Sequence, residues 1–449
     1  MIILRINDLP DVIDLFSGCG GLALGFQKAG FDVPKGIELM ENAALNASYN
    51  LNIRKGEAPG HICGDITKMA DDVFANTIGD NGCIVIGGPP CQAYSLVGRA
   101  KINSLREEGT FEDDHRGYLF QDFLRMIIGH NARAAVMENV RQSTAYGQIN
   151  VPEEVSKCLE EHGYTCWWTI LNAADFGVPQ VRERMILFAV KGKVEPVLPA
   201  PTRSGAKFER ANLFNGENAF KDCKYYIPPL TPAENLPSWL TVEEAIGDLP
   251  SLRLRPNEPY VANSMNLELP YEDEPENKYQ EVMRGNMEAV TGNVYHNNSR
   301  DYPIFARMRE SDNYTQALAI ANDILAEQCL AKGVSAGTPE YEKLKKAIVP
   351  PYSDDKFLSK WQKIDRAKPC HTLVAHMALD TYSHIHPWEP RGISVREAAR
   401  IQSFPDDYVF KSNMGEAFRQ IGNSVPPLMA QAIAETVKKA LRQQEMAHE

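Results

Sequence analysis

The stretch VIDLFSGCGG, Val12 to Gly21, decides the fold of this chain. It begins with a largely apolar run typical of a buried strand, continues into a glycine-rich turn, and leads into a predicted helix from Leu22 to Ala29. A strand that passes through such a turn into a helix is typical of α/β proteins with a ligand at the strand end. The stretch therefore predicts an α/β fold and a binding site beside the turn.

The turn departs from the common dinucleotide-binding pattern at one position. Gly18 and Gly20 fit the G-x-G-x-x-G spacing, but Ala23 stands where the third glycine is expected. Glu38 ends the next predicted strand, about twenty residues beyond Gly18, where a ribose-binding carboxylate is expected. Together with Gly64-Asp65 further along, these residues favour a nucleoside-containing ligand.

The alternation of short apolar runs and helical stretches continues to about residue 190. Strands are predicted near 11–17, 35–38, 84–87, 134–138, 164–171 and 184–190. This pattern is typical of a mainly parallel sheet covered by helices on both faces. A proline-rich stretch at 191–259 marks the exit from this domain, and 195–388 has the irregular α+β character of a second, smaller domain.

Helix signals return later in the chain. Thr241 and Glu244 have the spacing of a capping box, and Ser394 is the predicted N-cap of a helix that reaches Arg400. A terminal helix is predicted from about Pro427 to Gln443, because proline is tolerated in the first turn of a helix.

Two reactive groups stand at predicted strand ends. Cys91 follows the apolar run 84–86 and the stiff turn 87–90, which reads GGPP. Glu138 follows the apolar run 134–137. Since ligands bind at the carboxyl ends of strands in open α/β sheets, both groups are expected in one crevice. The alternatives are a small buried thiol for Cys91 and a surface ion pair for Glu138.

The length, composition and charge of the chain limit the classes of protein to which it can belong. The 449 residues, 43% of them hydrophobic and 24% charged, suffice for two or three globular domains. A net charge of −12 by itself argues against a nucleic-acid partner. However, acidic residues concentrate at 57–80 and 272–276, whereas arginines gather at 182–184, 300–309 and 391–400. A basic face toward DNA is one interpretation of the arginine groups, and solvated ion pairs are the other.

Nine cysteines include no Cys-x-x-Cys pair, which indicates reduced thiols in a cytoplasmic protein. The segment 376–387 contains three histidines, but neither a cysteine nor a carboxylate stands there at ligand spacing, so we expect no metal. The apolar stretches have the length of strands, and neither a signal peptide nor a membrane-spanning helix is expected.

Five sequence motifs occur in the same order as in a known family. They are Asp14–Gly21, Pro89–Gln92, Glu138–Val140, Gln180–Arg184 and Gln420–Pro427. With these motifs the chain, from residue 11 to about 437, resembles the DNA (cytosine-5) methyltransferases of the bacterial 5-methylcytosine type. Two departures from the family pattern are Tyr94 in place of phenylalanine and Ser394 in place of threonine.

The resemblance implies a Rossmann-like class I methyltransferase fold dependent on S-adenosylmethionine, with a smaller target-recognition domain. The expected domains are 1–194 (catalytic), 195–388 (target recognition) and 389–449, a segment that completes the catalytic domain. The terminal helix would pack on the N-terminal domain, which makes that domain discontinuous in sequence.

The resemblance also implies a mechanism and its residues. Cys91 would add to C6 of a flipped-out cytosine, protonated Glu138 would act at N3, Arg184 would contact the O2 edge, and Arg182 would support the pocket. The route needs no metal, and the base that removes the C5 proton is not identified. Residues expected at the cofactor are Phe16, Ser17, Gly18, Gly20, Gly21, Leu22, Glu38, Leu39, Asp65, Ile66, Pro90, Asn423, Ser424 and Val425.

Partners follow from the same resemblance. Gln92, Ser95 and Arg99 would contact double-stranded DNA from the loop after the nucleophile, and the second domain would read bases in the major groove. We expect a cytoplasmic, nucleoid-associated bacterial monomer that marks self DNA in a restriction-modification or phage-defence system, with other proteins of that system as possible partners. A catalytically silent DNA-binding relative and an RNA methyltransferase are the alternatives.

Overall fold

The computed structural model describes residues 9–90, 119–145, 149–208, 220–252, 264–352 and 360–446. The chain divides into two compact units. Unit 1 consists of Met1–Trp239 together with Ser424–Glu449, and unit 2 consists of Leu240–Asn423.

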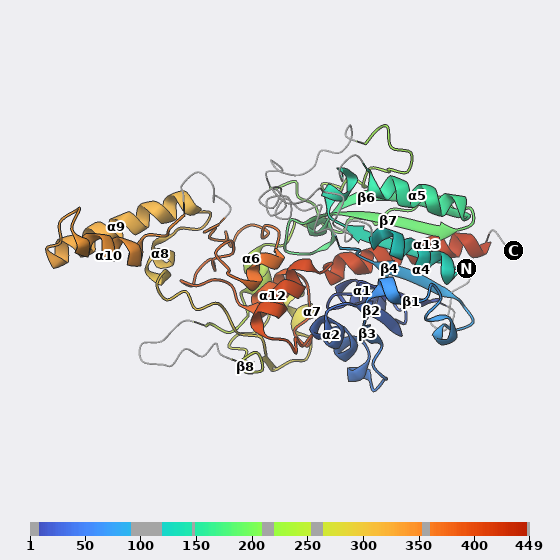
Figure 1. The fold of residues 1–449 in the computed structure, drawn as a ribbon, viewed down its shortest axis with the longest axis horizontal. Helices are drawn as coiled ribbons and strands as arrows, with labels where there is room; N and C mark the ends of the chain where they lie inside the picture. The colour runs from blue at the N-terminus through green and yellow to red at the C-terminus, as the bar shows by residue number, and fades with distance from the viewer. Residues whose placement is uncertain are drawn as a thin grey trace. The chain divides into compact units, whose positions relative to one another are not determined.

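Unit 1 is built on a seven-stranded sheet with the order β3-β2-β1-β4-β5-β7-β6 (Figure 1). The strands are β1 Asp11–Leu15, β2 Lys35–Glu38, β3 His61–Cys63, β4 Cys83–Gly87, β5 Ala134–Asn139, β6 Tyr164–Asn172 and β7 Glu183–Lys191. The first five run parallel, and β7 is antiparallel to both β5 and β6. This arrangement confirms the predicted α/β class and its mainly parallel sheet.

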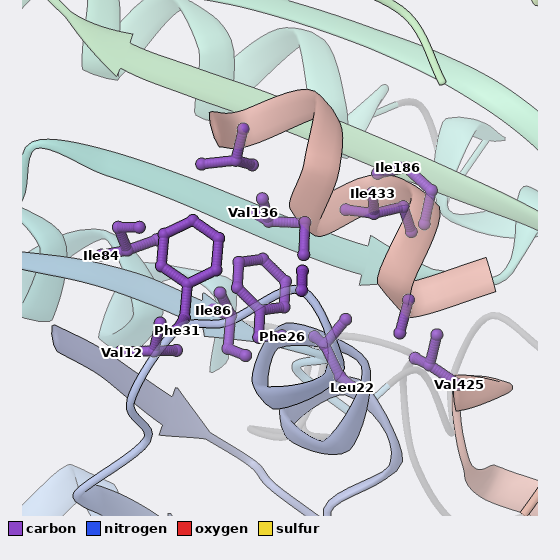
Figure 2. Close-up of a cluster of buried hydrophobic side chains, with 14 of the residues drawn as sticks. Val12, Leu22, Phe26, Phe31, Ile84, Ile86, Val136, Ile186, Val425 and Ile433 are labelled. Carbon is purple, nitrogen blue, oxygen red and sulfur yellow. The ribbon is translucent and has the colours of Figure 1, made fainter. Parts of the chain in front are cut away.

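Side chains alternate between the two faces of this sheet and form two cores. On β4, Ile84 and Ile86 belong to one core, and Val85 belongs to the other. The helices α1 (Gly21–Lys28), α2 (Glu41–Leu51) and α13 (Pro427–Met446) contribute to the first core, and α4 (Leu119–Gly129) and α5 (Val151–Glu161) contribute to the second. Figure 2 shows the first core, where Phe26 and Leu22 of α1 lie near Ile433 of α13.

The terminal helix α13 packs on α1, as predicted, so unit 1 combines the two ends of the chain. A Cβ atom built at Gly25 of α1 would lie 2.3 Å from Ala430 Cβ and 2.6 Å from the Ala430 carbonyl carbon. Glycine at this position therefore permits the close approach of the two helices.

The unit boundaries differ from the expected 194/195 and 388/389. Residues after 194 stay in unit 1 because they bond back to β6: Trp167 Nε1 donates to Val197 O at 2.9 Å, and Trp168 exchanges backbone hydrogen bonds with 225–227. Residues after 388 belong to unit 2 because their helix is tied into it, for example through the Arg400–Asp248 ion pair. Target recognition by 195–388 stays a prediction.

In its described residues, unit 2 contains α-helices of 5 to 19 residues and a small antiparallel sheet. Its elements are α6 Val242–Ile246, β8 Leu269–Pro270, α7 Lys278–Arg284, β9 Ala289–Val290, α8 Tyr302–Arg307, α9 Tyr314–Lys332, α10 Pro339–Ile348, the 3-10 helix η9 Ala375–Ala378, α11 Val395–Ile401 and α12 Met414–Asn423. The capping box predicted at Thr241 and Glu244 is present, and Ser394 caps α11 with Glu397 as its partner. In the described ranges no helix is long and apolar enough to cross a bilayer.

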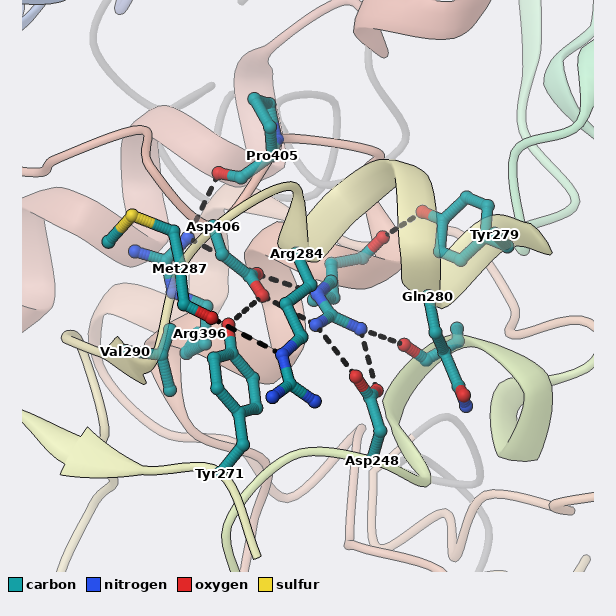
Figure 3. Close-up of polar contacts among 12 residues, drawn as sticks. Asp248, Tyr271, Tyr279, Gln280, Arg284, Met287, Val290, Arg396, Pro405 and Asp406 are labelled. Carbon is teal, nitrogen blue, oxygen red and sulfur yellow. Dashed lines mark hydrogen bonds and ion pairs between the residues drawn. The ribbon is translucent and has the colours of Figure 1, made fainter. Parts of the chain in front are cut away.

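Arginines of 391–400 lie inside unit 2 and not on a basic face. Arg400 is fully buried and pairs with Asp248 at 2.8 Å and with Asp406. Arg396, also buried, donates to Pro405 O (Figure 3) and to Tyr408 O. Neither interpretation of this arginine group from sequence is correct, because side chains with so little exposure reach neither DNA nor solvent.

Candidate active site

Four parallel strands of unit 1 end beside one another and carry the predicted site residues. Leu15 on β1 pairs with Ile37 on β2 and with Gly87 on β4, and Gly87 pairs with Met137 on β5. The residues that follow each strand end therefore lie along one edge of the sheet.

The glycine-rich turn after β1 has an unusual backbone. Phe16, Gly18 and Gly20 all have positive φ angles, of 55°, 54° and 82°. A positive φ angle is sterically unfavourable for Phe16, which has a Cβ atom, but not for glycine, which has none. A Cβ at Gly18 would meet no described atom within 4 Å, so its backbone faces open space, but a Cβ at Gly20 would lie 2.8 Å from Leu51 Cδ1. The turn thus presents bare backbone on one side and packs tightly on the other.

Glu38, at the end of β2, is bonded to this turn. Its Oε2 accepts a hydrogen bond from Gly18 N at 2.8 Å, and its Oε1 accepts one from Met40 N at 2.9 Å. Burial raises the pKa of the Glu38 carboxyl, although both backbone donors favour the charged form. Each carboxylate oxygen has a second lone pair, so a fixed Glu38 can still accept hydrogen bonds from hydroxyl groups.

The other predicted cofactor residues of unit 1 lie around the same strand ends. Leu39 is 66% exposed, Leu22 and Ile66 are buried, and Pro90 is half-buried. Asp65 caps the 3-10 helix Ile66–Lys68. Hydrogen bonds from Thr67 and then Lys68 hold the pKa of the partly exposed Asp65 below its ordinary value. The backbone of Gly64 donates to Glu38 O at 2.9 Å, which connects the ends of β3 and β2.

Motif Gln420–Pro427 crosses the boundary between the units. Asn423 is the last residue of α12 in unit 2, and Ser424 and Val425 begin the second segment of unit 1. Val425 packs in the core of unit 1 (Figure 2), and Ser424 O accepts a hydrogen bond from Arg182 Nη2 at 3.1 Å.

Glu138 and Arg184 form an ion pair at the ends of two antiparallel neighbours, β5 and β7. Arg184 Nε lies 2.9 Å from Glu138 Oε1, and both side chains are almost buried. Burial raises the pKa of the Glu138 carboxyl, and the charges of Arg184 and Arg182 offset part of that increase. Arg182 is itself fully buried. The structure thus brings together the three described residues that the sequence predicts for catalysis.

The GGPP turn, residues 87–90, begins at the end of β4 and lies close to the Glu138 carboxylate. A Cβ at Gly88 would lie 2.9 Å from Glu138 Oε2, and one at Gly87 would lie 2.4 Å from Leu15 O. Asn139 Nδ2 donates to Pro89 O at 3.1 Å and holds the turn in place. We assigned no role to Asn139 from sequence, although its place beside Glu138 in a quoted motif is a signal for one.

The predicted nucleophile Cys91 and the predicted DNA contacts Gln92, Ser95 and Arg99 lie outside the described residues. Cys19, in the turn after β1, is buried, and burial raises its thiol pKa to about 12. A thiol with such a pKa is almost entirely protonated at neutral pH, so Cys19 is a poor alternative nucleophile.

Sequence reasoning also missed a buried pair beneath the site. His61 Nε2 on β3 lies 3.6 Å from Asp14 Oδ2 on β1, and both side chains are almost fully buried. Gly36 on the intervening β2 leaves the space they use, because a Cβ there would lie 2.2 Å from His61 Cδ2. Nothing in the sequence pattern connects residues 14 and 61.

A sheet with this strand order, a carboxylate fixed to the first glycine-rich turn and an acid–arginine pair at the ends of β5 and β7 fit a nucleoside-cofactor-dependent transferase. The family model "C-5 cytosine-specific DNA methylase" matches residues 11–439. The chain belongs to this family, and it is a DNA (cytosine-5) methyltransferase.

Curated relatives agree with this assignment over nearly their whole length. The chain is 49% identical to "Putative type II methyltransferase M.OihORF3336P" of Oceanobacillus iheyensis, over 97% of this chain and 96% of the relative. It is 31% identical to the type II methyltransferase M.AgeI of Thalassovita gelatinovora, over 96% and 99% of the two chains.

The fold has a counterpart among solved structures. A crystal structure of an Escherichia coli prophage-encoded protein aligns with a TM-score of 0.62 at 21% identity, covering 96% of this chain and 99% of that one. This match supports the predicted fold.

Proposed function

We propose that the enzyme methylates C5 of a cytosine within a short recognition sequence in duplex DNA, through a covalent bond between Cys91 and C6 of a flipped-out base. The observation that carries the proposal is the Glu138–Arg184 pair, 2.9 Å apart and covered by the turn that leads to residue 91.

Cytosine C5 is too weak a nucleophile to be methylated directly. Addition of the Cys91 thiolate to C6 places electron density on C5 and negative charge toward N3. Cysteine needs little activation for this addition, since its thiolate is intrinsically nucleophilic. After methylation at C5, loss of the C5 proton and departure of Cys91 restore the aromatic ring.

Glu138 supplies the proton or hydrogen bond at N3 in this proposal. Its raised pKa favours the protonated carboxyl, which donates where a carboxylate cannot. Arg184, beside Glu138, would contact the O2 edge of the base, and buried Arg182 would hold the end of β7 against Ser424. Moving the cytosine out of the duplex stack costs a few kcal/mol of free energy, and these contacts help to offset that cost.

The family uses S-adenosylmethionine, which supplies the methyl group as an electrophile. The first strand end fits such a ligand: Gly18 exposes its backbone to open space, and Glu38 is fixed with acceptor sites to spare. In this proposal Glu38 binds the ribose hydroxyls, Phe16 stacks on the adenine and Asp65 contacts its amino group. Other proposed cofactor contacts are Ser17, Gly20, Gly21, Leu22, Leu39, Ile66, Pro90, Asn423, Ser424 and Val425.

Sequence-specific recognition is assigned to residues within 195–388, with Gln92, Ser95 and Arg99 at the DNA near the flipped base. The relatives' designation as type II methyltransferases supports a role in marking self DNA against a restriction or phage-defence nuclease. We propose that the enzyme acts as a monomer in the bacterial cytoplasm at the nucleoid.

The test is bisulfite sequencing of genomic DNA from a methylation-free bacterial host that expresses the enzyme, with Cys91→Ala as the control. Protected cytosines within one short motif, absent from the control, are the expected result. Unprotected DNA together with tritiated-methyl transfer to tRNA would overturn the proposed substrate.

A separate assay tests the covalent step. Cys91→Ser is expected to abolish turnover and to bind S-adenosylhomocysteine with unchanged affinity. Normal turnover by this variant would show that the covalent mechanism is wrong.

A further inference from the structure

The segment that follows the proposed cofactor residue Asp65 has little regular structure of its own. It forms the 3-10 helix Ile66–Lys68 and a second one at Ala75–Thr77. Residues 64–82 are all described, and they contain neither a strand nor an α-helix. The position of this segment therefore depends on contacts with its neighbours, because no ladder of backbone hydrogen bonds fixes it.

Arg125 of α4 binds this segment through its guanidinium group. Nη1 donates to Met69 O at 2.9 Å, and Nη2 donates to Ile66 O. Nη1 also pairs with Asp71 Oδ1 at 2.5 Å, and Nε pairs with Asp122 Oδ1, one turn earlier on α4, at 2.9 Å. One nitrogen thus fixes the side chain to its own helix, and the other two hold the segment.

The contact with Ile66 O acts on the backbone directly beside Asp65. The two residues share a planar peptide unit, so a shift of one moves the other. The Asp65 carboxylate caps the same 3-10 helix by accepting from Thr67 N at 3.1 Å. The place of the Asp65 side chain therefore follows the place of this helix.

The shape of the arginine side chain suits this task. A guanidinium group is planar and has five N–H donors in fixed directions, so it can bind two carbonyl groups and two carboxylates at once. A lysine ammonium group presents its donors from a single atom and cannot span the two carbonyls in the same way. The Asp71 side chain is 60% exposed, and such pairs contribute little, so the carbonyl contacts are the ones that matter.

The far end of the segment is held separately by the last residues of α4. A Cβ at Gly129 would lie 2.4 Å from Asp71 O, so the missing side chain allows close approach. Phe74 N donates to His130 Nε2 at 3.1 Å. These contacts do not involve Arg125, and they offer a comparison between the two ends of one segment.

We propose that Arg125 is a positioning residue of the cofactor site. It holds the 3-10 helix Ile66–Lys68 against α4 and so fixes Asp65 and Ile66 where they contact the cofactor. In this role Arg125 acts through these two residues and not by its own contact with the cofactor. The inference rests on the proposed function, because the contacts of Asp65 and Ile66 with S-adenosylmethionine are part of that proposal.

The experiment measures binding of S-adenosylhomocysteine to the full-length enzyme by isothermal titration calorimetry. Arg125→Met keeps an aliphatic side chain but removes every donor, and it should weaken binding about tenfold, because the residues at the adenine are displaced. Arg125→Lys keeps the charge without the planar group and should weaken binding about threefold. In steady-state kinetics the KM for S-adenosylmethionine should rise in both variants, whereas the KM for DNA should not.

Two control variants separate positioning from a general loss of stability. Arg133→Met removes an arginine of matched exposure, 26% against 25%, whose ion pair with Glu445 lies directly before β5. His130→Ala removes the contact with Phe74 N at the far end of the segment. Both controls should bind S-adenosylhomocysteine as wild type does, even where they lower the melting temperature. Circular dichroism and thermal melting of each variant show whether it is folded.

Several results would overturn the inference. Wild-type affinity in either folded Arg125 variant would do so and would leave the proposed function intact. An equal loss of affinity in His130→Ala would assign the effect to the stability of the whole segment, and failure of both Arg125 variants to fold would show a purely structural role. Absence of S-adenosylhomocysteine binding by the wild-type enzyme would instead contradict the proposed cofactor, and this inference with it.

Discussion

Arg184 Nε lies 2.9 Å from Glu138 Oε1, yet burial still raises the pKa of this carboxyl above its ordinary value. Desolvation disfavours the carboxylate more than the neighbouring guanidinium groups favour it. The pair therefore holds a carboxylic acid and a cation side by side. This arrangement suits a cytosine that receives a proton or hydrogen bond at N3 and is bound at its O2 edge.

Glu138→Gln should lower kcat by about 10²-fold or more, because amide and acid both donate a hydrogen bond but only the acid transfers a proton. Wild-type turnover should fall as pH rises through the raised pKa of Glu138, since the proton is lost there, and the variant should lack this decline. Steady-state kinetics from pH 5.5 to pH 9 measure both. Glu160→Gln, at an exposed ion pair on α5, is the control and should match wild type.

Glu38→Ala should weaken binding of S-adenosylhomocysteine by about 10- to 100-fold, because hydrogen bonds to a charged group contribute roughly 1.5–3 kcal/mol. Isothermal titration calorimetry measures the affinity. Glu41→Ala changes an exposed carboxylate three residues away and should leave the affinity unchanged. Equal affinities of the Glu38 variant and wild type would argue against the proposed ribose contact.

Glu397→Gln should destabilise the protein at pH 7 by about 3 kcal/mol, since it removes one partner of a buried ion pair. Burial favours the neutral carboxyl, but Arg391 and then His386 outweigh it and hold the pKa of Glu397 well below its ordinary value of 4.5. The stabilisation is thus complete above pH 4.5 and is lost as pH falls toward the folded-state pKa.

Urea unfolding at pH 7 and at pH 4 measures this difference. The gap between wild type and Glu397→Gln should narrow at the lower pH, and a constant gap would contradict the assignment. Glu416→Gln is the matched control, because Glu416 forms a partly exposed pair with Arg419 and such pairs contribute about 0–1 kcal/mol.

Gly25→Ala should lower the free energy of unfolding by about 1–3 kcal/mol through overpacking against Ala430. The same change in an open helix would raise stability by roughly 1 kcal/mol. Ala430→Gly should relieve part of the loss, but not all, because the backbone of residue 430 also lies within 2.6 Å of the added Cβ. A double-mutant cycle followed by urea unfolding tests this coupling.

Much of unit 1 could be predicted because its strands are apolar and its motifs are contiguous. The six predicted strands are present, and the prediction that α13 returns to the N-terminal part is confirmed. Strand β3 was missed because it has only three residues, His61–Cys63, and two of them are exposed. The antiparallel direction of β7 was not predicted, since the pattern of apolar residues does not encode strand direction.

Contacts between distant residues were not predictable in the same way. The family resemblance places Glu138 and Arg184 at one cytosine, but their direct ion pair follows only from the pairing of β5 with β7. The helix predicted at Ser394 is correct in its cap, but nothing in its sequence indicates that Arg396 and Arg400 are buried. Their burial depends on acids such as Asp248 from far along the chain.

The return of α13 onto α1 also has a consequence for synthesis of the chain on the ribosome. Residues 240–423, which form unit 2, emerge between the two segments of unit 1. At about 5–20 residues per second this takes on the order of ten to forty seconds. During that interval Phe26 and the rest of the apolar side of α1 lack the helix that covers them. The nascent enzyme is therefore open to chaperones and proteases until its last helix has been translated.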